Sequence, residues 1–238
     1  MSNYIPFIQG EQVSLCIPSD RAIDVDGWAD WFNDTSRLGA TRHGIFPNTR
    51  AQQHARLADM PTNDISLLLC DASAETAFGV LSLQAIDLVR REAEISLTVG
   101  RRDDKKLPRF ATLEGMARLT EHGFKELGLM RITAGQAAHL LVKWNRQMEM
   151  IGYRTEGILR DAFQRGHTSA DVYRIAALYD TYLALVEVRG GSLWPGVKAI
   201  ADLNHHQPKL SFAEKVDKAI SELEAEHFAY LSESGAYK

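Results

Sequence analysis

Cysteine is scarce in this chain of 238 residues, which holds only Cys16 and Cys70. Neither lies in a Cys-x-x-Cys motif or at metal-ligand spacing from a histidine, so the sequence predicts neither a disulfide-stabilised scaffold nor a structural zinc site. His205 and His206 lack an obvious third ligand, and adjacent residues rarely share one face. We therefore expect two small buried cysteines and no metal.

Long apolar runs and an excess of basic residues are also missing. No segment reaches about 18 consecutive apolar residues, and no basic region followed by an apolar core begins the chain. We therefore expect a cytoplasmic protein without a membrane anchor. The formal net charge of -4 gives no basic footprint of the kind that nucleic-acid-binding proteins carry. The sequence predicts neither a membrane nor a nucleic acid as partner.

The remaining composition, 45% hydrophobic and 24% charged, is that of a globular protein. Alternating or continuous short apolar runs predict strands over residues 12–17, 65–70, 77–83, 92–99 and 131–134. Apolar residues at helical spacing predict helices over residues 22–32, 49–60, 112–127 and 140–151. Thr49 is the expected N-cap of the second helix, and Gly128 and Gly152 close the last two. Strands and helices mixed in this way predict an α/β fold.

The chain changes character after Tyr179. Residues 187–196 are rich in turn formers and predict a linker, and residues 205–208 contain a second break. A capping-box pattern at Ser211 and Glu214 opens a helix that we expect to run to about residue 231. Its apolar stripe consists of Phe212, Val216, Ile220 and Leu223. We expect one domain over residues 1–180 and a linker with a helical extension over 181–238. The extension either docks on the domain, pairs two subunits as a homodimer, or closes an acceptor site.

Four segments in the middle of the chain follow one another in a specific order: AEISLTVG (93–100), RFATLEGM (109–116), HGFKELGLMRITAG (122–135) and MIGYRTEGILRDAF (150–163). Their order and spacing resemble the GNAT superfamily of N-acetyltransferases, within it the branch that acetylates protein N-termini and nucleotide-linked amino sugars. FIQGEQVSLCIPSD (7–20), WFND (31–34), GIFP (44–47) and FGVLSLQAID (78–87) extend the resemblance to roughly residues 5–180. It implies a mixed, mostly antiparallel central sheet flanked by helices.

The resemblance also implies a co-substrate, acetyl-CoA or another short acyl-CoA. In the family its pyrophosphate lies at a helix N-terminus, where unpaired N–H groups and the helix dipole favour anions. The matching loop here has Lys106 at its first basic position and Ala111 at its last small position, while Arg109 replaces the middle glycine. Arg109 either contacts the phosphates itself or weakens the binding of the co-substrate. The alternative is that residues 101–109 form only a solvated basic turn. The residues expected to bind the co-substrate are Leu97, Thr98, Val99, Lys106, Arg109, Phe110, Ala111, Thr112 and Asn145.

Acyl transfer to an amine needs a base, since an alkylammonium has no free lone pair at neutral pH. The resemblance places Glu94 on the strand beside the thioester and makes it the first candidate. A cross-strand partner on a wet sheet face is the alternative for Glu94. Asp87 is a second candidate for the base, or a turn cap. His43 precedes the GIFP segment, in the region that shapes the acceptor pocket of related enzymes, or is a surface residue.

The general acid stays unassigned. In the family a tyrosine on the last helix of the motif protonates the leaving thiolate, but the matching position here is Met148, which cannot donate a proton. Substitutes in the sequence are His139, Tyr153, Tyr173 and water.

The sequence therefore predicts an acyl-CoA-dependent N-acyltransferase for a primary amine. The favoured acceptor is an amino sugar carried on a nucleotide, because the segments from 31 to 100 look more like that branch. The alternatives are a protein N-terminus, a small-molecule amine, or a non-catalytic acyl-CoA-binding role.

Overall fold

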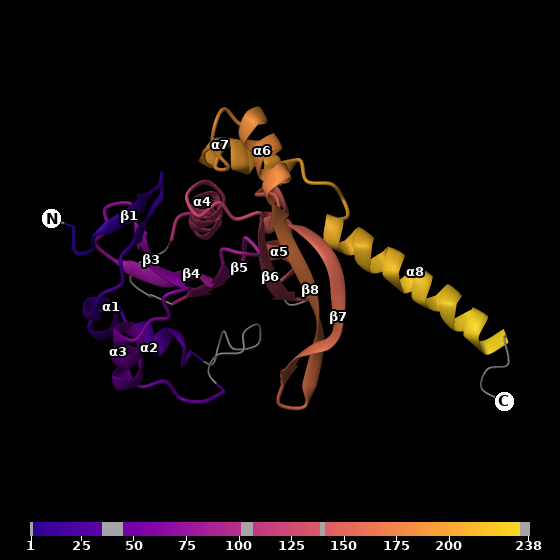
Figure 1. Cartoon of the computed structure of the whole chain (residues 1–238), viewed down its shortest axis with the longest axis horizontal. Helices are drawn as coiled ribbons and strands as arrows, with labels where there is room; N and C mark the ends of the chain where they lie inside the picture. Colours follow the sequence, from indigo (N-terminus) through magenta and orange to yellow (C-terminus); the bar gives the residue numbers. More distant parts are fainter. Residues whose placement is uncertain (1, 35–44, 101–106, 139–140, 234–238) are drawn as a thin grey trace.

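A computed structural model describes residues 2–34, 45–100, 107–138 and 141–233 of the chain. Eight strands and eight helices are assigned within these ranges (Figure 1). The strands are β1 Pro6–Gln9, β2 Val13–Cys16, β3 Ile65–Asp71, β4 Ala77–Asp87, β5 Glu92–Val99, β6 Arg131–Ala137, β7 Arg154–Arg165 and β8 Thr168–Leu178. The helices are α1 Asp20–Asp24, α2 Trp28–Trp31, α3 Arg50–Ala58, α4 Ala111–Lys125, α5 Val142–Met150, α6 Tyr179–Val188, α7 Val197–His205 and α8 Phe212–Glu233.

The strands form one sheet in the order β1-β2-β3-β4-β5-β6-β8-β7. Every neighbouring pair is antiparallel except β5 and β6, which run parallel. A parallel pair needs a crossover connection, and α4 supplies it between these two strands. The predicted mixed, mostly antiparallel α/β sheet flanked by helices is therefore confirmed.

Helices cover both faces of the first half of the sheet, which explains its continuous apolar strands. Along β3, Leu69 packs with α4 on one face, while Leu68 and Cys70 pack toward α1 and α2 on the other. In Figure 1, α4 lies above strands β3 to β5 and α1 to α3 lie below them. The expected burial of the two cysteines is confirmed, because Cys16 and Cys70 are both completely buried and unbridged.

The single helix expected over residues 22–32 is wrong. The structure has two short helices there, α1 and α2, separated at Gly27, whose φ of 81° lies in the left-handed region and interrupts a right-handed helix. The periodicity that predicted one helix came from Trp28 and Trp31, which do lie on one buried side of α2. The predicted N-cap Thr49 is confirmed and forms a reciprocal capping box with Gln52.

The segment expected as a linker over residues 187–196 is partly folded into the body. Helix α6 runs to Val188, and Leu193 and Trp194 beyond it are buried in the same core as the sheet. The indole N–H of Trp194 donates to Glu11 Oε2 at 3.0 Å, on the turn between β1 and β2. The division of the chain at residue 180 stays a prediction.

Helix α8 begins with the predicted capping box, in which Ser211 and Glu214 bond each other's N–H groups. Its start is held by Glu149 of α5, whose carboxylate accepts the N–H groups of Phe212 and Ala213 at 3.0 Å. Further along, α8 leaves the body (Figure 1), and Leu223 of the expected apolar stripe is 64% exposed. Homodimerisation through α8 stays a prediction. Among the described helices, none combines the length and apolar character that a membrane crossing requires.

Candidate functional site

The sheet opens between β5 and β6. The two strands pair only from Glu92 with Arg131 to Glu94 with Thr133. Beyond that point both strands continue, β5 to Val99 and β6 to the end of its range, without a further pair along these described segments. The two halves of the sheet therefore diverge after Glu94.

A cleft of about 400 Å³ lies where the strands diverge. It is bounded by both strands, by the first turns of α4 and by the start of α5. Its lining residues are Glu94, Ile95, Ser96, Leu97, Val99, Thr112, Met116, Ala134, Gly135, Gln136, Leu141 and Trp144. Three of the residues predicted to bind the co-substrate, Leu97, Val99 and Thr112, are thus brought together around one cleft with Glu94.

One edge of β5 offers its backbone groups to this cleft. The opposite edge is bonded to β4 as far as Val99, which pairs with Gly79. On the open side, the N–H and C=O groups past Glu94 have no neighbouring strand, and buried backbone groups of this kind need partners. The side chain of Thr98 belongs to the other face of the sheet, so only its backbone lies along the open edge. An extended chain that carries amides can bond this edge as an added strand does.

The start of α4 faces the same cleft. Phe110, immediately before the helix, has a φ of 67°, an uncommon value for a residue other than glycine. The guanidinium carbon of the exposed Arg109 lies 4.6 Å from the centre of the Phe110 ring, a cation–π distance. Ala111 is buried, and the first turn of the helix exposes N–H groups that lack acceptors within the helix. The left-handed residue is thus Phe110, one position after Arg109, where the resemblance in sequence would place a glycine.

Two buried carboxamides near the cleft lack partners within the described residues. Gln136 on β6 lines the cleft, and its Oε1 accepts no hydrogen bond. Asn145 on α5 follows the cleft residue Trp144, is 5% exposed, and has neither its Oδ1 nor its Nδ2 bonded. Leaving such a group unpaired costs about 1–3 kcal/mol. Both amides therefore have hydrogen-bonding capacity that the described residues do not use.

Glu94 stands where the pairing of β5 and β6 ends. Its side chain is 48% exposed, and its Oε2 lies 3.7 Å from a guanidinium nitrogen of Arg174 on β8. Both readings of Glu94 therefore have support, since the carboxylate lines the cleft and also pairs across strands. The position gives it contact with bulk water and with the cleft.

The structure does not bring Asp87 to the cleft. Asp87 is the last residue of β4 and pairs with Glu92, on the side of Glu94 where the sheet is closed. Its Oδ1 accepts the N–H groups of Arg90 and Val89, each at 2.8 Å, and the bond from Arg90 lowers the pKa of Asp87. This is the geometry of a turn cap. His43, Lys106 and His139 lie outside the described residues.

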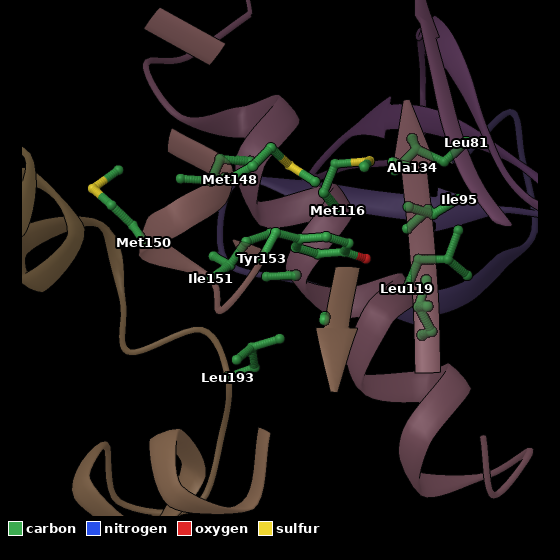
Figure 2. Packing of buried hydrophobic residues seen from close by; sticks show 14 of the residues in the cluster. Leu81, Ile95, Met116, Leu119, Ala134, Met148, Met150, Ile151, Tyr153 and Leu193 are labelled. Atoms are coloured by element: carbon green, nitrogen blue, oxygen red, sulfur yellow. The ribbon is translucent and has the colours of Figure 1, made fainter. Parts of the chain in front are cut away.

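Neither tyrosine that was considered as an acid reaches the cleft. Tyr153 is 1% exposed and bonds Thr120 Oγ1 at 2.8 Å, and burial raises its pKa. Figure 2 shows its ring among Met116, Met148 and Leu119, in the hydrophobic core. Tyr173 donates to Asp217 of α8 at 3.3 Å, and burial together with that carboxylate raises its pKa to about 12.

Known structures with this arrangement were found, although no family model and no curated protein matches the sequence. Spermidine N-acetyltransferase from Vibrio cholerae, solved with CoA and spermine, superposes with a TM-score of 0.62 over 73% of this chain and 99% of its own, at 18% identity. An acetyltransferase of the GNAT family from Bacillus anthracis gives a TM-score of 0.59 over 73% and 98%, at 19% identity. The chain has the GNAT fold.

A third structure with the GNAT fold is that of the microcin C7 self-immunity acetyltransferase MccE, solved with acetyl-CoA and AMP. It gives a TM-score of 0.58 over 71% of this chain and 93% of its own, at 16% identity. Identities at this level establish the common fold. The expected resemblance to the GNAT superfamily is therefore confirmed for the fold, and the narrower branch stays a prediction.

The sequence reasoning missed Gln136 and Arg174. Each comes from a strand that lies next to the cleft only after the sheet has formed, 42 and 80 residues beyond Glu94 in the numbering. The pattern of residues 131–134 predicted a strand, and its continuation to Ala137 was the one local signal that could have placed Gln136 at the cleft. Nothing local to Glu94 points to Arg174.

Proposed function

We propose that this protein is an acyl-CoA-dependent N-acyltransferase that acts on a primary amine. The observation that carries the proposal is the cleft that opens where β5 and β6 part after Glu94 and Thr133. It combines an open strand edge, a helix N-terminus and a carboxylate within one space. These are the three features needed to bind a long amide-bearing anion and to deprotonate an amine beside it.

The residues around the cleft fit such a co-substrate, which would supply an acyl group already activated as a thioester. The open edge of β5 from Ile95 to Thr98 offers N–H and C=O groups to the amides of a pantetheine arm. The start of α4 favours a pyrophosphate, with Arg109 available at the surface to contact it. The carboxamide of Gln136, whose Oε1 is unpaired within the described residues, lies on the opposite wall.

Glu94 serves as the base in this proposal. An alkylammonium has a pKa of about 10, so at neutral pH a carboxylate must take its proton, directly or through water. Glu94 is half exposed, which lets the proton pass on to bulk solvent, and Arg174 holds the carboxylate in place from 3.7 Å. Neither Tyr153 nor Tyr173 reaches the cleft, which leaves water, or His139 outside the described residues, to protonate the leaving thiolate. Most of the rate then comes from holding the two reactants together.

The acceptor favoured by the sequence is an amino sugar on a nucleotide, while the first structural neighbour above was solved with a polyamine. Acetyl-CoA is the simplest acyl donor, and longer acyl-CoAs are the alternative donors to be compared with it. The test measures thiol release from several acyl-CoAs in the presence of pools of amino-sugar nucleotides, N-terminal peptides, polyamines and simple amines. The combination that releases thiol identifies the acyl donor and the class of amine acceptor. Calorimetry of each CoA ester runs alongside.

Glu94→Gln tests the base. We expect kcat to fall by about 100- to 1,000-fold at neutral pH, and the deficit to shrink as the pH rises toward the pKa of the amine. Glu92→Gln is the matched control, because Glu92 lies on the same strand face but pairs with Arg90 at 3.7 Å and does not line the cleft. Unchanged turnover in Glu94→Gln would remove Glu94 as the base. Absence of any acyl-CoA binding would contradict the proposed function and favour a non-catalytic GNAT-fold protein.

A further inference from the structure

A second cavity, of about 350 Å³, lies where the C-terminal helices meet α5 and the start of β7. Helices α7 and α8 both contact α5, and the turn between them contributes part of the wall. The lining residues are Arg146, Glu149, Met150, Arg154, Leu203, His206, Gln207, Pro208, Ser211, Phe212 and Lys215. The cleft between β5 and β6 borders the start of α5, whereas this cavity borders its second half, and the two share no lining residue.

The carboxylate that borders this cavity already has hydrogen-bond donors. Glu149, the one carboxylate among the described lining residues, accepts the N–H groups of Phe212 and Ala213, each at 3.0 Å, through its two oxygens. It thereby caps α8, so the N-terminus of that helix is closed to a ligand. Arg146, one of the lining cations, is paired with Glu214 at 2.7 Å. These contacts hold the start of α8 on α5.

Arg154 lines the cavity without a carboxylate partner among the described residues. Its Nη1 donates to the backbone oxygens of Glu149 and Tyr153, at 2.7 and 2.8 Å, and the other guanidinium nitrogens have no recorded acceptor there. A second guanidinium, that of Arg189, also bonds only backbone oxygens. Burial, and after it the charge of Arg154, lowers the pKa of Arg189. The two like charges repel each other, and a bound anion would relieve that repulsion.

Lys215 borders the same space from α8 and forms no ion pair with the described residues. It follows Phe212 by three residues, so the two side chains share a face of the helix, and the guanidinium carbon of Arg154 lies 6.0 Å from the centre of the Phe212 ring. The buried Ser211 accepts the N–H of Glu214 at 3.1 Å and keeps its own O–H to donate. A guanidinium, an ammonium and a hydroxyl around one space suit the oxygens of a phosphate.

The rest of the cavity is apolar. Met150, Leu203, Pro208 and Phe212 line it beside the charged groups, and Leu203 and Phe212 are 43% and 41% exposed. An inorganic ion would leave these surfaces in water, whereas a ligand with an apolar part would cover them and gain about 25 cal/mol per Å². The volume also lies within the range of small-molecule sites, about 300–1,000 Å³. The cavity therefore suits an anion that carries an apolar group.

We propose that this cavity binds a small phosphate monoester with an apolar organic part, and that Arg154, Lys215 and Ser211 hold its phosphate. A phosphate monoester carries a charge of about -1.5 to -2 at pH 7, which matches two unpaired cations better than a single carboxylate does. Phe212 and its apolar neighbours cover the organic part. The inference goes beyond the proposed acyl transfer and does not depend on it, because the cavity and the cleft have no lining residue in common.

Phenyl phosphate is the probe for this site. Its binding to the full chain is measured by calorimetry in the absence of CoA, beside inorganic phosphate and phenol. We expect phenyl phosphate to bind about tenfold or more tightly than either, because inorganic phosphate lacks the apolar group and phenol lacks the charge. Lys215→Gln should weaken phenyl phosphate about tenfold, through the loss of one hydrogen bond between charged groups.

Lys218→Gln is the matched control, because Lys218 lies on the same helix, pairs with Glu222 at 3.7 Å and does not line the cavity, so binding should not change. Arg154→Gln should weaken binding as Lys215→Gln does, and the exposed Lys215 keeps the test valid if loss of the Arg154 bonds impairs folding. Arg109→Gln should have no effect, since Arg109 lies at the start of α4. Absence of binding to wild type, equal binding of phenol, or a loss in Arg109→Gln without one in Lys215→Gln would each overturn the assignment.

Discussion

Glu114 is a buried carboxylate that ties α4 to the turn between β1 and β2. Its side chain is 0% exposed, its Oε1 accepts the N–H of Glu11, and its Oε2 accepts the N–H of Gln12 at 2.8 Å. Arg118, one helical turn later, lies 3.3 Å from Oε1 and supplies the opposite charge. The carboxylate thus satisfies two backbone donors that no strand partner reaches.

Glu114→Gln measures how much the charged carboxylate and its hydrogen bonds contribute to the free energy of unfolding. The new amide group keeps one oxygen but turns a donor toward one of the two N–H groups. The loss of one hydrogen bond to a charged group is worth about 1.5–3 kcal/mol, and the remaining bond weakens by roughly 1 kcal/mol when its acceptor becomes neutral. We therefore expect the free energy of unfolding to fall by about 3 kcal/mol.

Urea unfolding followed by tryptophan fluorescence measures this change. With a slope of about 2–3 kcal/mol per molar, typical of small proteins, the midpoint should drop by about 1 M. Glu222→Gln is the control, because Glu222 forms only a surface pair with Lys218 at 3.7 Å and should cost less than about 0.5 kcal/mol. A loss below about 1 kcal/mol in Glu114→Gln would refute the reasoning.

Two further predictions concern contacts made by helices α2 and α3. His54 on α3 bonds Asp20 at 2.9 Å and Asp24 at 3.1 Å, and these bonds raise its pKa. The resulting stabilisation is fully present below the unfolded pKa of about 6.5 and is lost as the pH rises through the folded pKa. The melting temperature of wild type should therefore fall more between pH 6 and pH 8 than that of His54→Gln. Gly100→Ala should lower stability by about 1–3 kcal/mol by chemical unfolding, because the new Cβ would lie 2.2 Å from the indole of Trp31; a neutral result would show that α2 shifts freely.

Local sequence patterns predicted the bounds of a strand or the start of a helix correctly where a short motif determines them. The alternation of residues 92–99 gave β5 with the bounds that the structure has, and Thr49 and Ser211 marked helix starts correctly. Gly27 was overlooked, because the spacing of the neighbouring tryptophans suited one helix while the backbone at the glycine turned left-handed. The hydrophobic repeat reports which side is buried, but not whether the helix is continuous.

The candidate site was predictable only in part. Glu94 and the residues from Leu97 to Val99 follow from one strand and a family resemblance, and they do border the cleft. The point at which β5 and β6 stop pairing involves two strands that α4 separates in the sequence, so no local pattern encodes it. The lack of a partner for Gln136 Oε1 among the described residues is likewise visible only once the neighbours in space are known.

The short seam between β5 and β6 has a consequence for the lifetime of the protein. Three residue pairs join the two halves of an eight-stranded sheet there, so local opening should cost less free energy at this seam than within either half. A molecule that bonds both Leu97 on one side and Gln136 on the other would brace the halves together. At 100 times its dissociation constant such a ligand adds about 2.7 kcal/mol to the folded state. Under the proposed function, the supply of acyl-CoA would then govern how long each copy of the protein survives proteolysis.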